Sequence, residues 1–206
     1  MLMKKISVGA MGVNCYIVGA KNESIIIDPG DDADAICSYV EAEGLTVKYI
    51  LLTHCHFDHI LAAQDVKKKT NGLIVACLAE KNNLNNSSIN MTGRFTRTPL
   101  TLEADIYVSE GDTLTSEEYT FAVLETPGHS SGSMCIYCAS EKILFSGDTL
   151  FRCSIGRSDF PTGDYNSLIS SIKTKLYTLP KSTRVYPGHE TETTIEYEIT
   201  HNPFTA

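Results

Sequence analysis

One short segment constrains the fold of this chain more than any other. An apolar run that begins at Tyr49 leads directly into Thr-His54-Cys-His56-Phe-Asp58-His59, so four potential metal ligands occupy six residues at its end. Three histidines and an aspartate in such a cluster have no structural use that less reactive residues would not serve. Imidazole and carboxylate ligands together suit Zn, Fe or Mn. The segment therefore predicts a metal site just beyond the end of a buried strand.

The spacing within this cluster favours two ions. His54 and His56 lie two residues apart in an extended turn, so both imidazoles can face one ion. Asp58 and His59 follow where the chain turns into a helix, and we expect their side chains to point elsewhere. Two ions are therefore easier to satisfy than one.

Three further strand ends repeat the same setting. Residues 124–129 (LETPGH), 144–148 (LFSGD) and 185–189 (VYPGH) each combine the end of an apolar run, a glycine and one potential ligand. A glycine allows a tight turn at such a point. We expect the four strand ends to converge on one edge of the fold, where one carboxylate bridges two ions. The predicted ligands are His54, His56, Asp58, His59, His129, Asp148 and His189.

One further aspartate and one further histidine are not predicted to bind metal. Asp28 follows three isoleucines and precedes a Pro-Gly pair, so we expect it to orient a ligand or to cap a turn rather than to bind metal. His201 lies outside any such motif, and we expect an ordinary surface residue.

The order of apolar runs predicts the architecture. Short β-rich runs come in two batches, each followed by helical patterns, which indicates two sheets packed face to face with helices outside. Strands are expected at residues 4–8, 15–18, 24–27, 49–52, 73–77, 121–124, 134–137, 143–145 and 184–186. Helices are expected at residues 32–43, 60–69 and 165–176. Residues 80–105 follow neither periodicity, and both an active-site lid and a plain surface loop fit them.

The length, net charge and cysteine content of the chain indicate its number of domains, its partners and its compartment. A chain of 206 residues is expected to form one domain, residues 1–206. Its net charge of −8 disfavours broad contact with phosphate backbones or anionic lipid, so we expect a small-molecule substrate, no nucleic acid and no membrane. Glycines interrupt the apolar stretch near the N-terminus before a signal-peptide core develops, and the seven scattered cysteines suit reduced thiols. We therefore expect a cytoplasmic protein.

The order THCHFDH, TPGH, SGD and PGH resembles the metallo-β-lactamase fold superfamily, and this resemblance covers the whole chain. It implies an α/β fold, a four-layer αββα sandwich with the metals at one edge. The resemblance implies that His54, His56 and His129 bind the first ion. It implies that Asp58, His59 and His189 bind the second ion and that Asp148 bridges the two.

Within the superfamily, the chain is similar to the glyoxalase II-like hydrolases through residues 146–151 (SGDTLF) and 188–194 (GHETETT). This similarity implies two divalent ions, Zn with Fe or Mn as alternatives. It also implies hydrolysis of a hydroxyacylglutathione-like thioester or an ester by a metal-bridging hydroxide, with Asp58 as the catalytic residue that steers the proton. Class B β-lactamases lack an aspartate at the position of Asp148 and are exported, so the chain departs from them.

The residues that would bind the substrate match less well. Glyoxalase II carries a C-terminal helical domain, for which the residues after His189 leave no room. Arg157 matches a basic residue of the glyoxalase loop, but Asp159 and Thr191 stand where tyrosines are expected. Arg157 could bind a substrate carboxylate or could be a loop residue held by Asp159. Lactoylglutathione, a smaller thioester and a lactone therefore compete as substrates.

Two functions of other classes stay open. A persulfide dioxygenase of the same superfamily uses one iron, with ligands that match His54, His129 and Asp148. A non-catalytic metal-binding scaffold would keep the ligands behind a blocked pocket. RNA-processing relatives carry additional RNA-gripping segments, for which an acidic chain of 206 residues has little room.

Overall fold

Strands β2 (Val13–Gly19) and β3 (Glu23–Ile27) are buried along nearly their whole length, so continuous apolar runs form them. Their side chains divide between two cores, because successive residues of a strand point to opposite faces. Ile26 faces one core, whereas Ile25 and Ile27 face the other. A sheet that is apolar on both faces needs a covering layer on each side.

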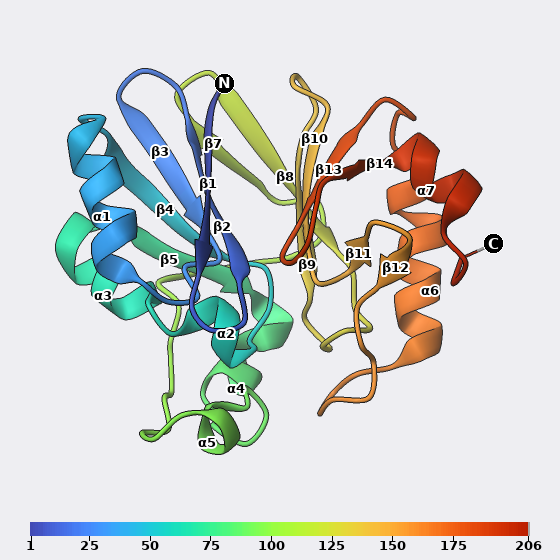
Figure 1. Cartoon of the computed structure of the whole chain (residues 1–206), viewed down its shortest axis with the longest axis horizontal. Coiled ribbons are helices and arrows are strands. Elements are labelled where there is room, and N and C mark those ends of the chain that lie inside the picture. The colour runs from blue at the N-terminus through green and yellow to red at the C-terminus, as the bar shows by residue number, and fades with distance from the viewer. Residues whose placement is uncertain (206) are drawn as a thin grey trace.

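The computed structural model describes residues 1–205 (Figure 1). Its first sheet has six strands. Its strands are β1 (Leu2–Val8), β2, β3, β4 (Thr46–Leu52), β5 (Leu73–Cys77) and β6 (Ile106–Val108). They lie in the order of the chain, antiparallel up to β3 and parallel from β3 onward. Helices α1 (Ala33–Ala42) and α3 (Ala63–Thr70) cover the outer face of this sheet.

The second sheet is also six-stranded. Its strands are β7 (Thr113–Ser116), β8 (Tyr119–Glu125), β9 (Met134–Cys138), β10 (Ile143–Gly147), β13 (Arg184–Pro187) and β14 (Thr193–Thr194). They lie in the order β14, β13, β10, β9, β8, β7, and β10 and β13 run parallel. On its outer face lie helices α6 (Tyr165–Thr174) and α7 (Ile195–His201), with the 3-10 turn η2 (Leu176–Thr178) after α6 (Figure 1). Strands β11 (Leu150–Phe151) and β12 (Ser154–Ile155) form a separate two-stranded hairpin.

The inner faces of the two sheets meet in one apolar layer, which includes Tyr16, Phe121 and Phe145. The chain therefore forms the predicted four-layer αββα sandwich. Cys135 belongs to the core under α6, and Cys138 belongs to the layer between the sheets. No helix among residues 1–205 is long and apolar enough to span a membrane.

Every expected strand has a counterpart, but one expected helix is wrong in detail. Residues 60–69 do not form a single helix, because they divide between α2 (Phe57–Ile60) and α3. The break follows from a backbone bond: the N–H of Ala62 donates to the carbonyl of Pro29 at 3.0 Å and leaves the helical pattern.

Residues 80–105 contain more structure than the sequence indicated. The 3-10 turn η1 (Leu78–Glu80) leads into α4 (Lys81–Leu84), and α5 (Thr92–Phe95) follows. Helices of four residues are too short to show an apolar period. Asn90 fixes the rest of the segment, because its side-chain amide donates to the carbonyls of Leu84 and Leu100 at 2.9 Å each.

Candidate metal centre

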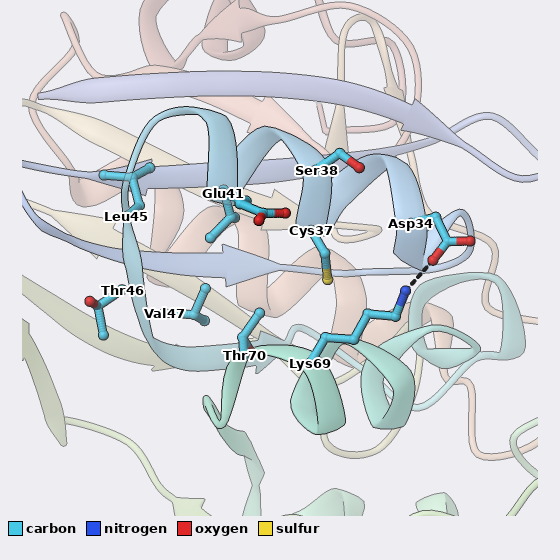
Figure 2. Close-up of a pocket in the computed structure, with 10 residues that line it drawn as sticks. Asp34, Cys37, Ser38, Glu41, Leu45, Thr46, Val47, Lys69 and Thr70 are labelled. Carbon is cyan, nitrogen blue, oxygen red and sulfur yellow. Dashed lines mark hydrogen bonds and ion pairs between the residues drawn. The ribbon is translucent and has the colours of Figure 1, made fainter.

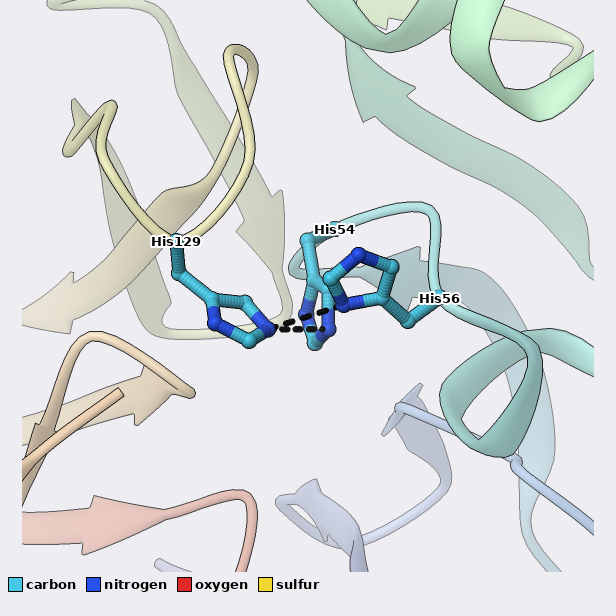
Figure 3. Close-up of side chains that lie close together, drawn as sticks. All are labelled: His54, His56 and His129. Atoms are coloured by element: carbon cyan, nitrogen blue, oxygen red, sulfur yellow. Dashed lines mark hydrogen bonds between the residues drawn. The ribbon is translucent and has the colours of Figure 1, made fainter. Parts of the chain in front are cut away.

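Three histidines from two loops face one another at one edge of the sandwich (Figure 3). His54 and His56 follow β4, and His129 follows β8. Nε2 of His129 lies 2.8 Å from Nδ1 of His56 and 3.2 Å from Nε2 of His54. All three side chains are buried. Ring nitrogens that converge so closely resemble the ligands of a single ion, because a neutral imidazole binds metal through its unprotonated nitrogen.

A second group lies beside the first. Helix α2 carries Asp58 and His59, and His189 follows β13. Oδ2 of Asp58 lies 3.4 Å from Nε2 of His189 and 3.9 Å from Nε2 of His59. The ligand atoms of this group all lie within 4.8 Å of one another, as do those of the first group.

Asp148, which follows β10, lies between the two groups. Its Oδ2 is 3.6 Å from Nε2 of His129 and 3.6 Å from Nε2 of His189. Its Oδ1 is 3.4 Å from Nε2 of His59. The structure thus brings all seven predicted residues together, with one carboxylate within reach of both groups.

The chemistry of the donor atoms fits a metal. Nε2 of His59 and Oδ1 of Asp148 are buried and have no hydrogen-bond partner in the protein. Buried polar atoms without a partner cost free energy, and their presence calls for an explanation such as an ion. Nitrogen and carboxylate donors together suit divalent Zn, Fe or Mn. The residues therefore fit divalent metal.

The two groups differ in charge. Burial, with the neighbouring histidines, lowers the pKa of His54 well below its usual range and that of His56 to about 3. Burial acts in the same direction on His59, but nearby carboxylates, chiefly Asp148 and Asp28, outweigh it and raise its pKa to about 10. His54 and His56 are thus neutral without a metal, whereas His59 in the second group carries a proton.

The other two members of the second group form an ion pair. Burial would raise the pKa of Asp58, but the charge of His59 and the hydrogen bond from His189 hold it below its usual range. Burial would lower the pKa of His189, but the hydrogen bond to Asp58 and the charge of Asp148 raise it. The surroundings therefore favour the charged forms of both residues in the metal-free protein.

Asp28 contacts one group directly and the other through Thr53. Its Oδ2 lies 3.0 Å from Nδ1 of His59 and accepts a hydrogen bond from Oγ1 of Thr53 at 2.7 Å. Oγ1 of Thr53 also lies 3.1 Å from Nδ1 of His54. Asp28 thus contacts a candidate ligand, as expected for a residue that orients one. Thr53 was not predicted, and its place directly before His54 is the one sequence signal for it.

Two glycines are required for close approach. A Cβ at Gly30 would overlap the backbone oxygen of Asp58, so the turn after β3 can pack under α2 only without a side chain. A Cβ at Gly188 would overlap Oδ1 of Asp148 and would lie 2.7 Å from Cε1 of His59. The Pro-Gly turn before His189 therefore leaves the space that the ligands occupy.

Arg157 reaches the site through its backbone. Its carbonyl oxygen lies 2.7 Å from Nδ1 of His129 and fixes that ring, a role that the sequence did not indicate. Its guanidinium donates to both carboxylate oxygens of Asp159, at 2.9 and 2.7 Å. The role of Arg157 in substrate binding stays a prediction. His201 is exposed, as expected for a surface residue.

A cavity of about 630 Å³ opens over the seven residues, and five of them line it. This volume lies within the range of small-molecule sites, about 300–1,000 Å³. A larger depression, of about 710 Å³, lies between α1 and α3, where Lys69 forms an ion pair with Asp34 (Figure 2). Among residues 1–205, no group of three potential metal ligands includes a residue of that depression. The chemistry therefore belongs to the smaller cavity.

Solved structures resemble the whole chain. A B3 metallo-β-lactamase, BLEG-1, has a TM-score of 0.94 and 40% identity, with 100% of both chains covered. A di-iron-bound form of TTHA1623 has a TM-score of 0.86 and 32% identity, with 98% of this chain and 99% of that one covered. ETHE1 from Myxococcus xanthus has a TM-score of 0.81 and 28% identity, with 98% and 84% covered.

Sequence relatives point the same way. A probable metallo-hydrolase of Bacillus subtilis, YqgX, is 37% identical and covers 99% of this chain and 97% of its own length. The hydroxyacylglutathione hydrolase GloC of Haemophilus influenzae is 36% identical, with 97% and 95% covered. Residues 8–189 match the family described as the metallo-beta-lactamase superfamily. With its cluster of histidines and aspartates, the chain belongs to the metallo-beta-lactamase superfamily and to the metal-dependent hydrolases within it.

Proposed function

We propose that the protein hydrolyses a thioester or an ester with two divalent ions, in the manner of glyoxalase II. The observation that carries the proposal is the position of Asp148 between two groups of three ligands, because a shared carboxylate is what a two-ion site needs. The 36% identity to a hydroxyacylglutathione hydrolase supports this class of substrate. The proposed ligands are His54, His56, Asp58, His59, His129, Asp148 and His189.

Each part of the site has a role in such a reaction. Divalent ions bound there would act as Lewis acids and would lower the pKa of water from 15.7 to about 7. Asp58, whose pKa the site holds below its usual range, would accept a proton from the attacking water. Asp28 and the carbonyl of Arg157 keep the rings of His59 and His129 aimed at the centre. Arg157 could bind a substrate carboxylate after exchange with Asp159.

Zn is the proposed metal, since imidazole and carboxylate ligands suit it and it has no redox chemistry of its own. Iron is the alternative that the di-iron-bound form of TTHA1623 supports.

Metal analysis coupled to hydrolysis tests the proposal. We expect two ions of Zn, Fe or Mn per chain in the purified protein, together with release of thiol from lactoylglutathione or from a simple thioester. Chelation should abolish turnover, and metal should restore it. Turnover by metal-free protein, or a chain with two ions that cleaves no ester or thioester, would contradict the proposal.

Two other functions have support from specific likenesses. The likeness to ETHE1 favours the mononuclear iron persulfide dioxygenase, which would hold one iron per chain and consume oxygen without hydrolysis. The likeness to BLEG-1 favours hydrolysis of a β-lactam amide, which the same ligands could support. An oxygen electrode and a chromogenic β-lactam, used on the same preparation, separate both from the thioesterase.

We also propose that the protein acts on a small molecule in the cytoplasm. All seven cysteines are free in the structure, and most of them are buried, as a reducing compartment favours.

A further inference from the structure

The cavity over the candidate metal centre is mostly apolar outside the ligands themselves. Seven of its sixteen lining residues are Met, Phe or Ile. Two large apolar side chains at its mouth are strongly exposed: Met11 to 57% and Phe95 to 52%. Large exposed apolar side chains that gather beside a cavity mark a surface that binds something apolar.

One apolar wall comes from α2 and α5. The rings of Phe57 and Phe95 stack with their centroids 4.8 Å apart and their planes at 15°. Phe57 lies directly between His56 and Asp58, so this wall begins at the metal ligands. Asn90 and Thr92 fix the segment that carries Phe95, because Oδ1 of Asn90 accepts hydrogen bonds from N and Oγ1 of Thr92 at 2.9 and 2.7 Å. The wall is therefore formed before any substrate arrives.

Aromatic side chains from the second half of the chain supply the other wall. Phe160 meets the ring of His56 edge-on, with centroids 5.5 Å apart. Phe151 lies 6.3 Å from the ring of His189. Aromatic rings thus flank the ligands from both halves of the sandwich, which suits a flat apolar group.

Outside the candidate ligands, the cavity offers little to an anionic substrate. Arg157 is the one lysine or arginine among the lining residues, and Asp159 takes two of its hydrogen bonds. The guanidinium also lies over the ring of Phe160, with Cζ 4.1 Å from the ring centroid. Glu190, which has no such partner among the lining residues, adds a negative charge. A carboxylate-bearing thiol such as glutathione would therefore find no unpaired guanidinium or ammonium group among the lining residues.

We infer that the cavity selects a neutral ester or thioester with a flat, apolar acyl group, and that the Phe57–Phe95 stack binds this group. The inference rests on the proposed hydrolase and specifies its substrate class. Phe95 is then a specificity-determining residue, and residues 80–105 serve as a fixed wall of the site.

A pair of neutral thioesters tests the inference on the metal-loaded protein. The 3-phenylpropanoyl and acetyl thioesters of N-acetylcysteamine differ only in the acyl group, and loss of thioester absorbance follows both. We expect kcat/KM for the phenylpropanoyl compound to exceed that for the acetyl compound at least about tenfold. Phe95→Ala should reduce this ratio to below about threefold, mainly through KM. Phe95→Leu, which keeps an apolar side chain but loses the stacked ring, should give an intermediate ratio.

Phe204→Ala is the matched control, because Phe204 is 47% exposed but does not line the cavity. It should leave the ratio unchanged. Equal kcat/KM values for the two thioesters, or a ratio that survives in Phe95→Ala, would overturn the inference and leave the hydrolase intact. A higher kcat/KM for lactoylglutathione than for the phenylpropanoyl compound would also overturn the inference and leave the hydrolase intact.

A binding measurement keeps the inference testable if no thioester is cleaved. The ketone 4-phenylbutan-2-one has the shape of the phenylpropanoyl group and cannot be hydrolysed. Titration calorimetry should give a Kd for this ketone at least about tenfold below that for butan-2-one, and Phe95→Ala should remove the difference. That result without turnover would refute the thioesterase and support the apolar site, whereas equal Kd values would refute the apolar site.

Discussion

Oδ2 of Asp28 lies 3.0 Å from Nδ1 of His59, so the ring turns its other nitrogen, Nε2, toward Asp148. The two residues are far apart in the chain, and both are buried. A carboxylate on the outer nitrogen of a metal-binding histidine fixes its tautomer and raises its basicity. Asp28 is thus a positioning residue for the second group of ligands.

We expect Asp28→Asn to weaken metal binding about 10- to 100-fold, because an amide no longer holds the proton on Nδ1 of His59 with a negative charge. The second ion per chain should be lost first on dialysis against a chelator. Elemental analysis after dialysis at graded chelator concentrations measures this. Asp65→Asn, a change to an exposed aspartate of α3, is the control. Equal retention of both ions by Asp28→Asn and the wild type would contradict the assigned role.

Gly188→Ala should disturb the centre sterically without changing any ligand. The new Cβ would overlap Oδ1 of Asp148 and lie 2.7 Å from Cε1 of His59, so one of these side chains must move. We expect fewer than two ions per chain and a loss of hydrolysis of at least about 100-fold, since small misplacements at a catalytic site cost that much. Gly44→Ala is the contrast, because a Cβ there meets no atom within 4 Å but has a strained φ of +66°. It should lower the thermal midpoint and leave the metal content unchanged.

Much of the architecture could be predicted because the buried strands are continuous apolar runs. Residues 24–27 and 49–52 are such runs, and both are strands. β14 has two residues and β6 has three, which is too short for a pattern to appear. The break between α2 and α3 could not be predicted, because the carbonyl of Pro29 that causes it comes from a distant part of the chain.

The candidate ligands could be predicted for a different reason. Histidine and aspartate at strand ends are visible as chemistry in the sequence, and the topology brings those ends together. The supports of the site are not visible in this way. The carbonyl of Arg157 holds His129, and every residue has a carbonyl, so no residue type signals the contact. The stack of Phe57 on Phe95 likewise depends on how residues 80–105 fold back.

Asp159→Ala should release the guanidinium of Arg157 for an anionic substrate. In the native protein Asp159 accepts two hydrogen bonds from it, at 2.9 and 2.7 Å. We expect KM for lactoylglutathione to fall about threefold, with little change in kcat, because a free guanidinium can pair with a substrate carboxylate. Steady-state kinetics on the neutral acetyl thioester should show no such fall. The double variant Arg157→Ala/Asp159→Ala should lose the gain, and if it keeps the gain, Arg157 does not reach the substrate.

Metal binding should release protons from the second group but not from His54 or His56 of the first. In the metal-free protein nearby carboxylates, chiefly Asp148, outweigh burial and raise the pKa of His59 to about 10, whereas burial lowers that of His56 to about 3. An ion binds only the unprotonated ring, so binding at His59 must displace a proton at neutral pH. Affinity of the second group should therefore rise with pH between about 6.5 and 10, by up to about tenfold per unit for each proton released. His54 and His56 are already neutral over this range, so their protonation should change the affinity of the first group little.

Calorimetric titration of the metal-free protein in buffers of different ionisation enthalpy counts these protons. At pH 7 we expect about one or two protons released per pair of ions. His56→Ala, which damages the first group, should keep the release. Asp58→Ala, which damages the second group, should reduce it, because the hydrogen bond that chiefly raises the pKa of His189 against burial is gone. Equal proton release from the two variants would show that the carboxylates do not hold a proton on the second group.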